Sequence, residues 1–359
     1  MNNNRQLVTN IRLPGITVPV LSWQCHLTSY GNLCTFEART SIQQFKKFGY
    51  NIFEVQQSDF ELECQIILID NTGGTSQIVF DGIVDTVEGT WEDDIIEISG
   101  RDYSAVLRDK DDTLDKYINQ TVSQVVQGIA TDNNILTSID ATSQIAGIRA
   151  STFQGEDWSM STSPRPTWHI IQQLADEVGY VAYMDQHKVL HFEAPGKGQT
   201  HAYYWRPDNT VENPIMTLSM TQQSRRCSNF TLRVHGYDVN GKQTIFVDVV
   251  RGSGNGHFYH KSRQDLTAAN AKEIADNLAD EILRKNLVIK LVVEGNTDLN
   301  VNDQIQILES ELGDLLGLDN RPLFITGILH SFSMPDYGSE EGDGFLTHIT
   351  CNQMTTTST

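Results

Sequence analysis

The residues most able to do chemistry are the oxygen-bearing ones just after position 108. Four of them stand at every second position: Asp109, Asp111, Thr113 and Asp115. Oxygen ligands at this spacing are typical of a calcium loop, which also needs a glycine at its sharp turn and a bidentate glutamate at its end. Leu114 and Gln120 stand at those two positions. The pattern therefore favours a solvated acidic turn over a metal site.

Two histidines and three glycines also have a suggestive spacing. His187 and His191 lie four residues apart and could share one strand face, but no third metal ligand is evident. Gly252, Gly254 and Gly256 lack the strand, turn and helix context of a nucleotide-binding loop. We interpret the glycines as a flexible hairpin loop.

Catalytic motifs are missing from the sequence. It contains no G-x-S-x-G elbow, no H-E-x-x-H helix and no G-x-x-x-x-G-K-[ST] phosphate loop. Glu92 with Asp93 or Asp94 forms a carboxylate pair beside Trp91, but a glycosidase needs its carboxylates about 5 to 10 Å apart across a cleft. We therefore predict no catalytic residue, no cofactor, no metal site and no enzymatic activity.

The length, the net charge and the cysteines limit which classes of protein the chain can belong to. The chain has 359 residues, which predicts two or three domains, and a net charge of −20, which argues against a surface that neutralises nucleic-acid phosphates. No apolar run approaches the length of a membrane span, and the amino-terminal residues lack a signal-peptide core, so we expect synthesis and folding in a cytoplasm. Five isolated cysteines are expected to be reduced and buried: Cys25, Cys34, Cys64, Cys227 and Cys351.

Strand patterns fill the first 110 residues. The runs are rich in Ile, Val, Phe and Thr and are separated by turn signals: Val18 to Leu27, Leu33 to Ala38, Phe60 to Ile69, Ser76 to Glu88 and Asp94 to Ser99. Five short strands at this spacing indicate a small barrel or sandwich. The polar segment Ser41 to Gln57 is expected to be a long loop or a projecting hairpin at its rim.

Helix patterns follow in the middle of the chain. Two apolar stripes predict helices, one with Val122, Val125, Val126 and Ile129, the other with Ile170, Ile171, Leu174, Ala175 and Val178. Tyr180 to Met184 and Lys188 to Phe192 predict a hairpin. The polar segment Thr131 to Ser163 is expected to be an irregular surface excursion.

Strands return from Ile215 onward, interrupted by one amphipathic helix. That helix is predicted between Leu266 and Arg284, with an apolar face of Ala271, Ile274, Ala275, Leu278, Ala279 and Ile282. Strands are predicted at Ile215 to Met220, Phe230 to Gly236, Gln243 to Val250, Leu287 to Val293, Val301 to Leu308, Phe324 to Phe332 and Phe345 to Cys351.

The two β regions echo each other. Phe60 to Ile69 followed by Phe80 to Asp85 resembles Val301 to Leu308 followed by Ile325 to His330, with Gly-Ile in the middle of each second strand. Chance similarity between two β-meanders remains an alternative to duplication. The echo suggests two similar barrels.

Several of these segments resemble one protein family. The run Phe80 to Asp85 and the run Ile98 to Leu107 resemble the end of the first domain in phage late-control gene D proteins, the baseplate hubs of contractile tails, related to the amino-terminal part of VgrG spikes. The helix before Leu287, then Val293-Glu294-Gly295, Leu299 and Asn302-Asp303, is similar to a later signature. Gly327 to His330 is similar to the closing segment, so the resemblance covers most of residues 18 to 353.

The resemblance implies an α+β, mostly β fold with two tail-tube-like barrels joined by an α/β middle domain. It implies a first barrel at residues 1–108, a middle domain at 109–213 plus 237–286, and a discontinuous second barrel at 214–236 plus 287–354. Residues 355–359 are expected to be a disordered tail.

The resemblance also implies a structural role in the virion tail baseplate, assembled in the host bacterial cytoplasm. Its expected partners are two further copies in a homotrimer, the tail tube protein, the central spike protein, baseplate wedge proteins and the tape measure protein. DNA would only pass through the channel, so the acidic charge has two interpretations: solubility by self-repulsion, or a channel wall that repels DNA.

Two other function classes stay open. One is a tail-associated cell-wall hydrolase, although no segment resembles an inserted lysozyme. The other is a carbohydrate-binding tail module with tryptophans as stacking platforms, against the alternative that they pack in cores: Trp91, Trp158, Trp168 and Trp205.

Overall fold

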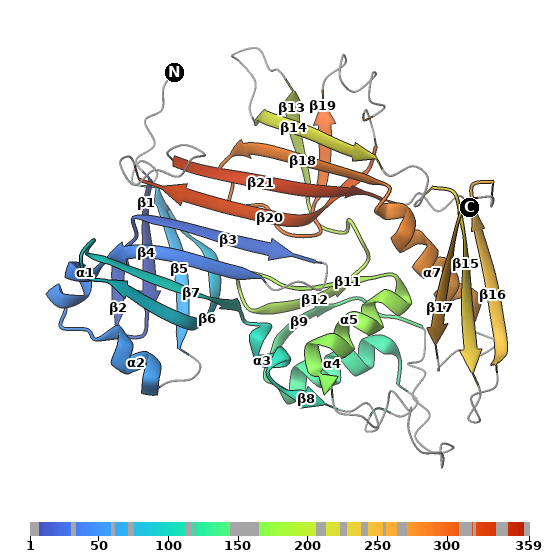
Figure 1. The fold of residues 1–359 in the computed structure, drawn as a ribbon, viewed down its shortest axis with the longest axis horizontal. Coiled ribbons are helices and arrows are strands. Elements are labelled where there is room, and N and C mark those ends of the chain that lie inside the picture. Colours follow the sequence, from blue (N-terminus) through green and yellow to red (C-terminus); the bar gives the residue numbers. More distant parts are fainter. Residues whose placement is uncertain are drawn as a thin grey trace.

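The structure is a computed structural model of the chain. It describes residues 7–29, 34–58, 62–70, 75–112, 117, 120–143, 165–205, 213–222, 228–237, 243–253, 256–263, 271–308, 318, 321–334 and 344–354. Most of these residues lie in strands (Figure 1). The expected mostly β, α+β fold is confirmed.

The amino-terminal strands form one curved group: β1 (Leu7–Leu13), β2 (Ile16–Pro19), β3 (Ser22–Thr28), β4 (Thr35–Ser41), β5 (Glu63–Asp70), β6 (Thr75–Thr90) and β7 (Ile95–Asp102). Their order in the sheet is β3-β4-β7-β6-β5-β1-β2. The two ends of this row meet, because the Val20 amide donates to the Thr9 carbonyl at 2.9 Å and the Leu21 amide donates to the Arg39 carbonyl at 2.7 Å. The chain therefore passes from β2 to β3 across the seam of a barrel-like unit.

The polar segment Ser41 to Gln57 is mostly helical, so the expectation of a loop or a hairpin is wrong. It contains α1 (Ile42–Lys47) and α2 (Ile52–Ser58). The Ser41 hydroxyl caps α1 by accepting from the Gln43 amide at 3.1 Å. Only one side of each helix is apolar, with Ile42, Phe45 and Ile52 buried in the barrel core. Helices this short show less than two turns of periodicity, and the sequence pattern is correspondingly weak.

The carboxy-terminal strands close into a ring of six. They are β13 (Thr200–Trp205), β14 (Pro214–Gln222), β18 (Leu287–Glu294), β19 (Gln304–Leu308), β20 (Leu323–Ser333) and β21 (Gly344–Gln353). Their order is β13-β14-β18-β21-β20-β19, and β19 pairs with β13 to complete the circle. Leu287, Ile289, Leu291 and Val293 alternate inward along β18, as period-two burial requires.

One ladder joins the two barrel units into a single 13-stranded sheet. β20 pairs with β19 through Leu323 and Phe324, then with β3 from Gly327 to Ser333. The buried side chains of both units form one continuous hydrophobic core. The units are therefore packed against each other as well as hydrogen-bonded, and they lie side by side in Figure 1.

The strand order is the same in the two units. The row β5-β6-β7-β4-β3 of the first unit is matched by β19-β20-β21-β18-β14 of the second, with every neighbouring pair antiparallel. Each unit also has a β-bulge in its long strand, between Val84 and Thr86 in β6 and between Ile325 and Gly327 in β20. The internal echo is thus present in the topology.

The residue alignment suggested by the echo is wrong in the second strand. Aligning the two bulges places Gly327 opposite Thr86, not opposite Gly82. The two Gly-Ile pairs therefore occupy different positions and resemble each other by chance.

The middle region is an α/β layer beneath the barrels (Figure 1). Its elements are α3 (Ala105–Arg108), β8 (Asp111–Asp112), α4 (Val122–Asp132), β9 (Leu136–Ile139), β10 (Arg165–Pro166), α5 (Thr167–Val178), β11 (Val181–Met184) and β12 (Val189–Glu193). A capping box of Thr121 and Gln124 starts α4, and Gly179, with a φ of 73°, ends α5. The predicted helices and hairpin are confirmed. The expectation that Thr131 to Ser163 is irregular is wrong in its first part, because β9 lies there and pairs with β12; residues 144–163 lie outside the described part.

A separate three-stranded sheet carries the remaining helix. β15 (Phe230–Tyr237) lies between β16 (Gln243–Arg251) and β17 (His257–Arg263), and α7 (Ala271–Arg284) packs on one face of this sheet. The predicted apolar face of α7 is buried. β15 is hydrogen-bonded to β16 and β17, although the predicted boundary at residue 236 groups it with the second barrel. The domain boundaries stay a prediction.

Within the described residues, no helix is long and apolar enough to cross a membrane.

Candidate functional site

A buried polar cluster at Asn302 and Asp303 ties the second barrel to the middle region. Asn302 has a left-handed backbone with a φ of 74°, and its side chain accepts from the Gly196 amide at 2.6 Å. Its amide nitrogen donates to the Glu193 carboxylate and to the Ala194 carbonyl, each at 3.0 Å. A single asparagine therefore fixes the chain between β12 and β13.

Asp303 holds the next residues in the same way. One carboxylate oxygen accepts from the Gln199 amide at 2.8 Å, while the other accepts from the Asn300 amide at 2.8 Å and lies 3.0 Å from His201 Nε2. A Cβ added to Gly198 would lie only 2.2 Å from Asp303 Oδ1, so this approach requires glycine. Asn302 and Asp303 are both buried, and their roles are structural.

The cluster continues to the β11–β12 hairpin. The Tyr183 hydroxyl donates to Glu193 Oε1 at 2.9 Å, and the His191 ring stacks on Tyr183 with centroids 4.7 Å apart. His191 Nε2 lies 3.0 Å from Asp185 Oδ2. Burial alone would raise the pKa of Asp185, but hydrogen bonds from His191 and two backbone amides outweigh it and lower the pKa. The carboxylate is therefore held in its charged form.

Lys188 at the hairpin tip contacts the first barrel. Its ammonium lies 2.9 Å from Glu63 Oε1, 3.3 Å from Asp81 Oδ1 and 4.7 Å from the centre of the Tyr103 ring. Together with the Asn302 and Asp303 contacts, this bridge connects the hairpin to both barrel units.

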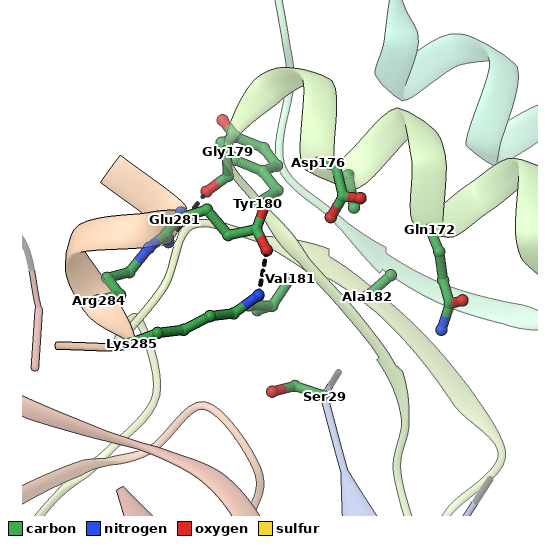
Figure 2. A pocket seen from close by; sticks show the side chains of 11 residues that line it. Ser29, Gln172, Asp176, Gly179, Tyr180, Val181, Ala182, Glu281, Arg284 and Lys285 are labelled. Atoms are coloured by element: carbon green, nitrogen blue, oxygen red, sulfur yellow. Dashed lines mark hydrogen bonds and ion pairs between the residues drawn. The ribbon is translucent and has the colours of Figure 1, made fainter. Parts of the chain in front are cut away.

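A cleft of about 230 Å³ lies where α5, β11 and α7 meet, close to Ser29 at the end of β3 (Figure 2). Arg284 donates to the Gly179 carbonyl at 3.4 Å, and Lys285 pairs with Glu281 at 2.5 Å. The Ser29 hydroxyl donates to the Thr326 carbonyl at 3.4 Å. Arg284 and Ser29 therefore join neighbouring elements, while Lys285 pairs along the end of α7. Among the residues that line the cleft, no nucleophile and base are arranged for catalysis.

The predicted acidic turn is partly described. Arg101 binds Asp85 at 2.7 Å and Asp109 at 2.9 Å, which lowers the pKa of Asp109 mainly through the hydrogen bond from Arg101. Asp111 lies in β8, and residues 113–116 lie outside the described part. Asp109 is therefore part of an ion-pair cluster with Arg101.

The two candidate histidines are not brought together on a strand. β12 begins at Val189, so His187 lies exposed in the turn while His191 packs on Tyr183. The expectation that they could share one strand face is wrong, because His187 lies in the turn and the strand begins at Val189, one residue after the predicted Lys188. In the described part of the chain no group of three metal-ligating side chains comes together.

The glycine-rich segment is not a hairpin loop. β16 and β17 lie on opposite sides of β15, so β16 ends and β17 begins on either side of Phe230, at the start of β15. A Cβ on Gly256 would lie 1.7 Å from the Asn229 carbonyl oxygen, and Gly252 has a φ of 67°. The glycines allow a close crossover; Gly254 lies outside the described residues.

The described carboxylates and tryptophans lie in a turn, in cores and at one exposed position. Asp94 accepts a hydrogen bond of 2.5 Å from the Ser41 hydroxyl, which fixes the β6–β7 turn beside exposed Glu92 and Asp93. Trp168 is buried, Trp205 packs on the barrel core, and Trp91 is 66% exposed. Trp158 lies outside the described part.

Four of the predicted buried cysteines are free and buried: Cys25, Cys34, Cys64 and Cys351. Burial raises the pKa of each thiol above its ordinary value. These thiols are unreactive small hydrophobes, and Cys227 lies outside the described residues.

No family model and no curated protein matches the sequence. Solved structures do match the fold. A tail protein from Neisseria meningitidis gives a TM-score of 0.68 at 13% identity over 96% of each chain. The 43 kDa tail protein of prophage MuSo2 from Shewanella oneidensis gives 0.67 at 17% identity over 96% of this chain and 98% of that one.

A third structure extends the likeness beyond phage tails. The Francisella PdpA–VgrG complex gives a TM-score of 0.50 at 12% identity, covering 98% of this chain and 59% of the matched chain. The three similarities agree with the family resemblance in the sequence. The described chain therefore has the fold of these two phage tail proteins, shared with a VgrG complex.

Proposed function

We propose that this chain is the structural hub of a contractile phage tail baseplate or a related injection machine. Three copies would form a ring that joins a sixfold tail tube to a threefold central spike and lines the channel between them. The observation that carries the proposal is the repeated strand order of the two barrel units. A trimer of such chains presents six similar units, which is the number that a sixfold tube requires.

The partners follow from this role. The tail tube protein would meet one face of the ring and the central spike protein the other, with wedge proteins at the rim and the tape measure protein within the tube. The chain would act in the virion tail after assembly in the host cytoplasm, without catalysing a reaction.

The mass of the native assembly tests the threefold ring. We expect native mass spectrometry of the purified full chain to show a species three times the 40.3 kDa chain mass. A chain that stays a monomer at high micromolar concentration contradicts the proposal.

The two open alternatives have their own tests. Clearing of cell wall in a zymogram by the purified chain would replace the structural role with a hydrolase. Saturable binding on a glycan array would favour the carbohydrate-binding module, for which exposed Trp91 is the available aromatic surface among the described tryptophans.

A further inference from the structure

Two of the strand edges that lack a ladder partner within the described residues belong to the barrel units and occupy related places in them. One is the outer edge of β14 from Met216 to Gln222, since β13 pairs only with Pro214 and Ile215. The other is the outer edge of β6 from Thr86 to Thr90, since the β5 ladder ends at Ile83. Unpaired edges of this kind are templates for adding another strand.

The chain already contains a ladder between the equivalent strands. β3 occupies in the first unit the place that β14 occupies in the second, and the second half of β20 corresponds to the second half of β6. β3 and β20 pair antiparallel through seven residue pairs, from Ser22 with Ser333 to Thr28 with Gly327. The free edge of β14 therefore corresponds to the edge of β3 that pairs with β20, and the free edge of β6 corresponds to the edge of β20 that pairs with β3.

The ladders define which residues correspond. In the second unit, Gly327 pairs with Thr350, Thr350 with Lys290, and Lys290 with Ser219, so Ser219 is three strands away from Gly327 in the same row. In the first unit, the residue three strands away from Thr86 in the same row is Gln24. Ser219 therefore corresponds to Gln24. Because Gln24 pairs with Ser331, four residues beyond Gly327, its counterpart should pair four residues beyond Thr86.

We propose that β14 of one copy adds antiparallel to β6 of a second copy of this chain, in the register of the internal β3–β20 ladder. Ser219 then lies opposite Thr90, Met220 opposite Gly89 and Thr221 opposite Glu88. Each copy donates one edge and accepts the other, which is a head-to-tail contact that closes into a ring when the rotation fits. Closure at three copies rests on the proposed function.

Burial supports the pairing. On β3, Trp23 is 3% exposed and Cys25 is 0% exposed beneath the β20 ladder. Their counterparts Leu218 and Met220 are only partly buried against the barrel core. On the accepting side, Ile328 is fully buried, whereas its counterpart Val87 is partly exposed. A second strand at each edge would complete the burial of apolar side chains that already point at the core.

Charge supports it as well. Soluble proteins protect free edges with charged side chains, yet Met216 to Gln222 contains no charged residue in a chain that is 20% charged. Met216 is 59% exposed. An exposed, uncharged, partly apolar edge is suited to being covered in the assembled state.

Cysteine cross-linking tests the register. Ser219→Cys and Thr90→Cys are made as two single variants of the full chain and mixed under mild oxidation with diamide. We expect a two-chain band only in the mixture, because the contact is head-to-tail, and a disulfide-linked peptide between positions 219 and 90 in the mass spectrum. The double variant should shift from one chain to a closed three-chain species.

The control keeps the same strands but breaks the register. Ser219→Cys mixed with Val87→Cys should give no more cross-linking than either variant alone, since Val87 lies three positions away and faces the core. Equal cross-linking in the control and test pairs would overturn the proposal.

Native mass separates this inference from the proposed function. A trimer that forms no 219–90 disulfide overturns the strand pairing and leaves the hub in place. A 219–90 disulfide in open chains or in rings of another size supports the pairing and overturns the threefold hub. A persistent monomer without the disulfide overturns both.

Discussion

His330 shows how a single buried side chain can make the fold sensitive to acid. Its ring lies 2.9 Å from the Thr347 hydroxyl, and burial lowers its pKa to about 3. The unfolded chain binds a proton at this histidine below about pH 6.5, while the folded chain does not. The contribution of neutral His330 to stability is therefore present above about pH 6.5 and lost as the pH falls toward 3.

The prediction concerns the pH dependence of His330→Gln. The difference in unfolding free energy between the original chain and the variant should fall by about 1.4 kcal/mol for each pH unit of acidification below about 6.5. Urea unfolding at several pH values measures it. A difference that stays constant between pH 4 and 6 would contradict a neutral buried histidine.

Asp102 is predicted to act in the opposite direction. Burial raises the pKa of this carboxyl to about 6, although hydrogen bonds from the side chains of Ser104 and Cys34 lower it in part. The folded chain holds a proton that the unfolded chain releases near pH 4, so stability falls as the pH rises from about 4 to 6. In Asp102→Asn this slope should disappear, which the same urea series would detect against Asp93→Asn as the exposed control.

The Asn302 and Asp303 cluster gives a third residue-scale prediction. Asp303→Ala removes the acceptor of two backbone amides and should lower the unfolding free energy by at least about 2 kcal/mol. Asp93→Ala, in an exposed turn, is the matched control and should change it by less than about 0.5 kcal/mol. Thermal unfolding of both variants makes the comparison, and equal losses would show that the cluster contributes little.

At the scale of elements, β19 is the strand most sensitive to a buried charge. Ile305 and Ile307 are each 2% exposed, while Gln306 between them faces outward. Ile305→Asp or Ile307→Asp should abolish folding or assembly, because the barrel core cannot solvate an unpaired carboxylate. Gln306→Asp should leave both intact. Circular dichroism and native mass together report the result, and normal assembly of the Ile305 variant would show that this strand is misplaced.

Elements with a strong period could be predicted from the sequence, and contacts between distant segments could not. The apolar stripe of α7 and the alternation in β18 specify their buried faces locally. By contrast, Asn302 and Gly196 are far apart in sequence, and nothing local shows that one accepts a hydrogen bond from the other. The free edges that we propose to pair between copies could not be predicted from the sequence for the same reason. β14 has an ordinary strand pattern, and only the pairing of its neighbours shows which edge is open.

At the scale of the whole molecule, the net charge of −20 predicts that the chain does not bind DNA. An acidic channel wall would repel phosphates and let a genome pass without binding. We expect no change in the fluorescence anisotropy of labelled duplex DNA when the purified chain is added at about 50 mM salt, where phosphate contacts are strong. A basic protein of similar size is the positive control. Saturable binding by this chain would contradict the acidic-channel interpretation.

The β3–β20 ladder has a kinetic consequence for the proposed ring. The two repeating units belong to one polypeptide and this ladder pairs them within it, so three of the six seams are formed during the folding of single chains. The other three seams form between chains, two of them through encounters that depend on protein concentration and the last by closure of the ring. A ring built from six separate single-unit chains would need five encounters, whereas three copies of this chain need two, and dilution can open the ring only at every second seam.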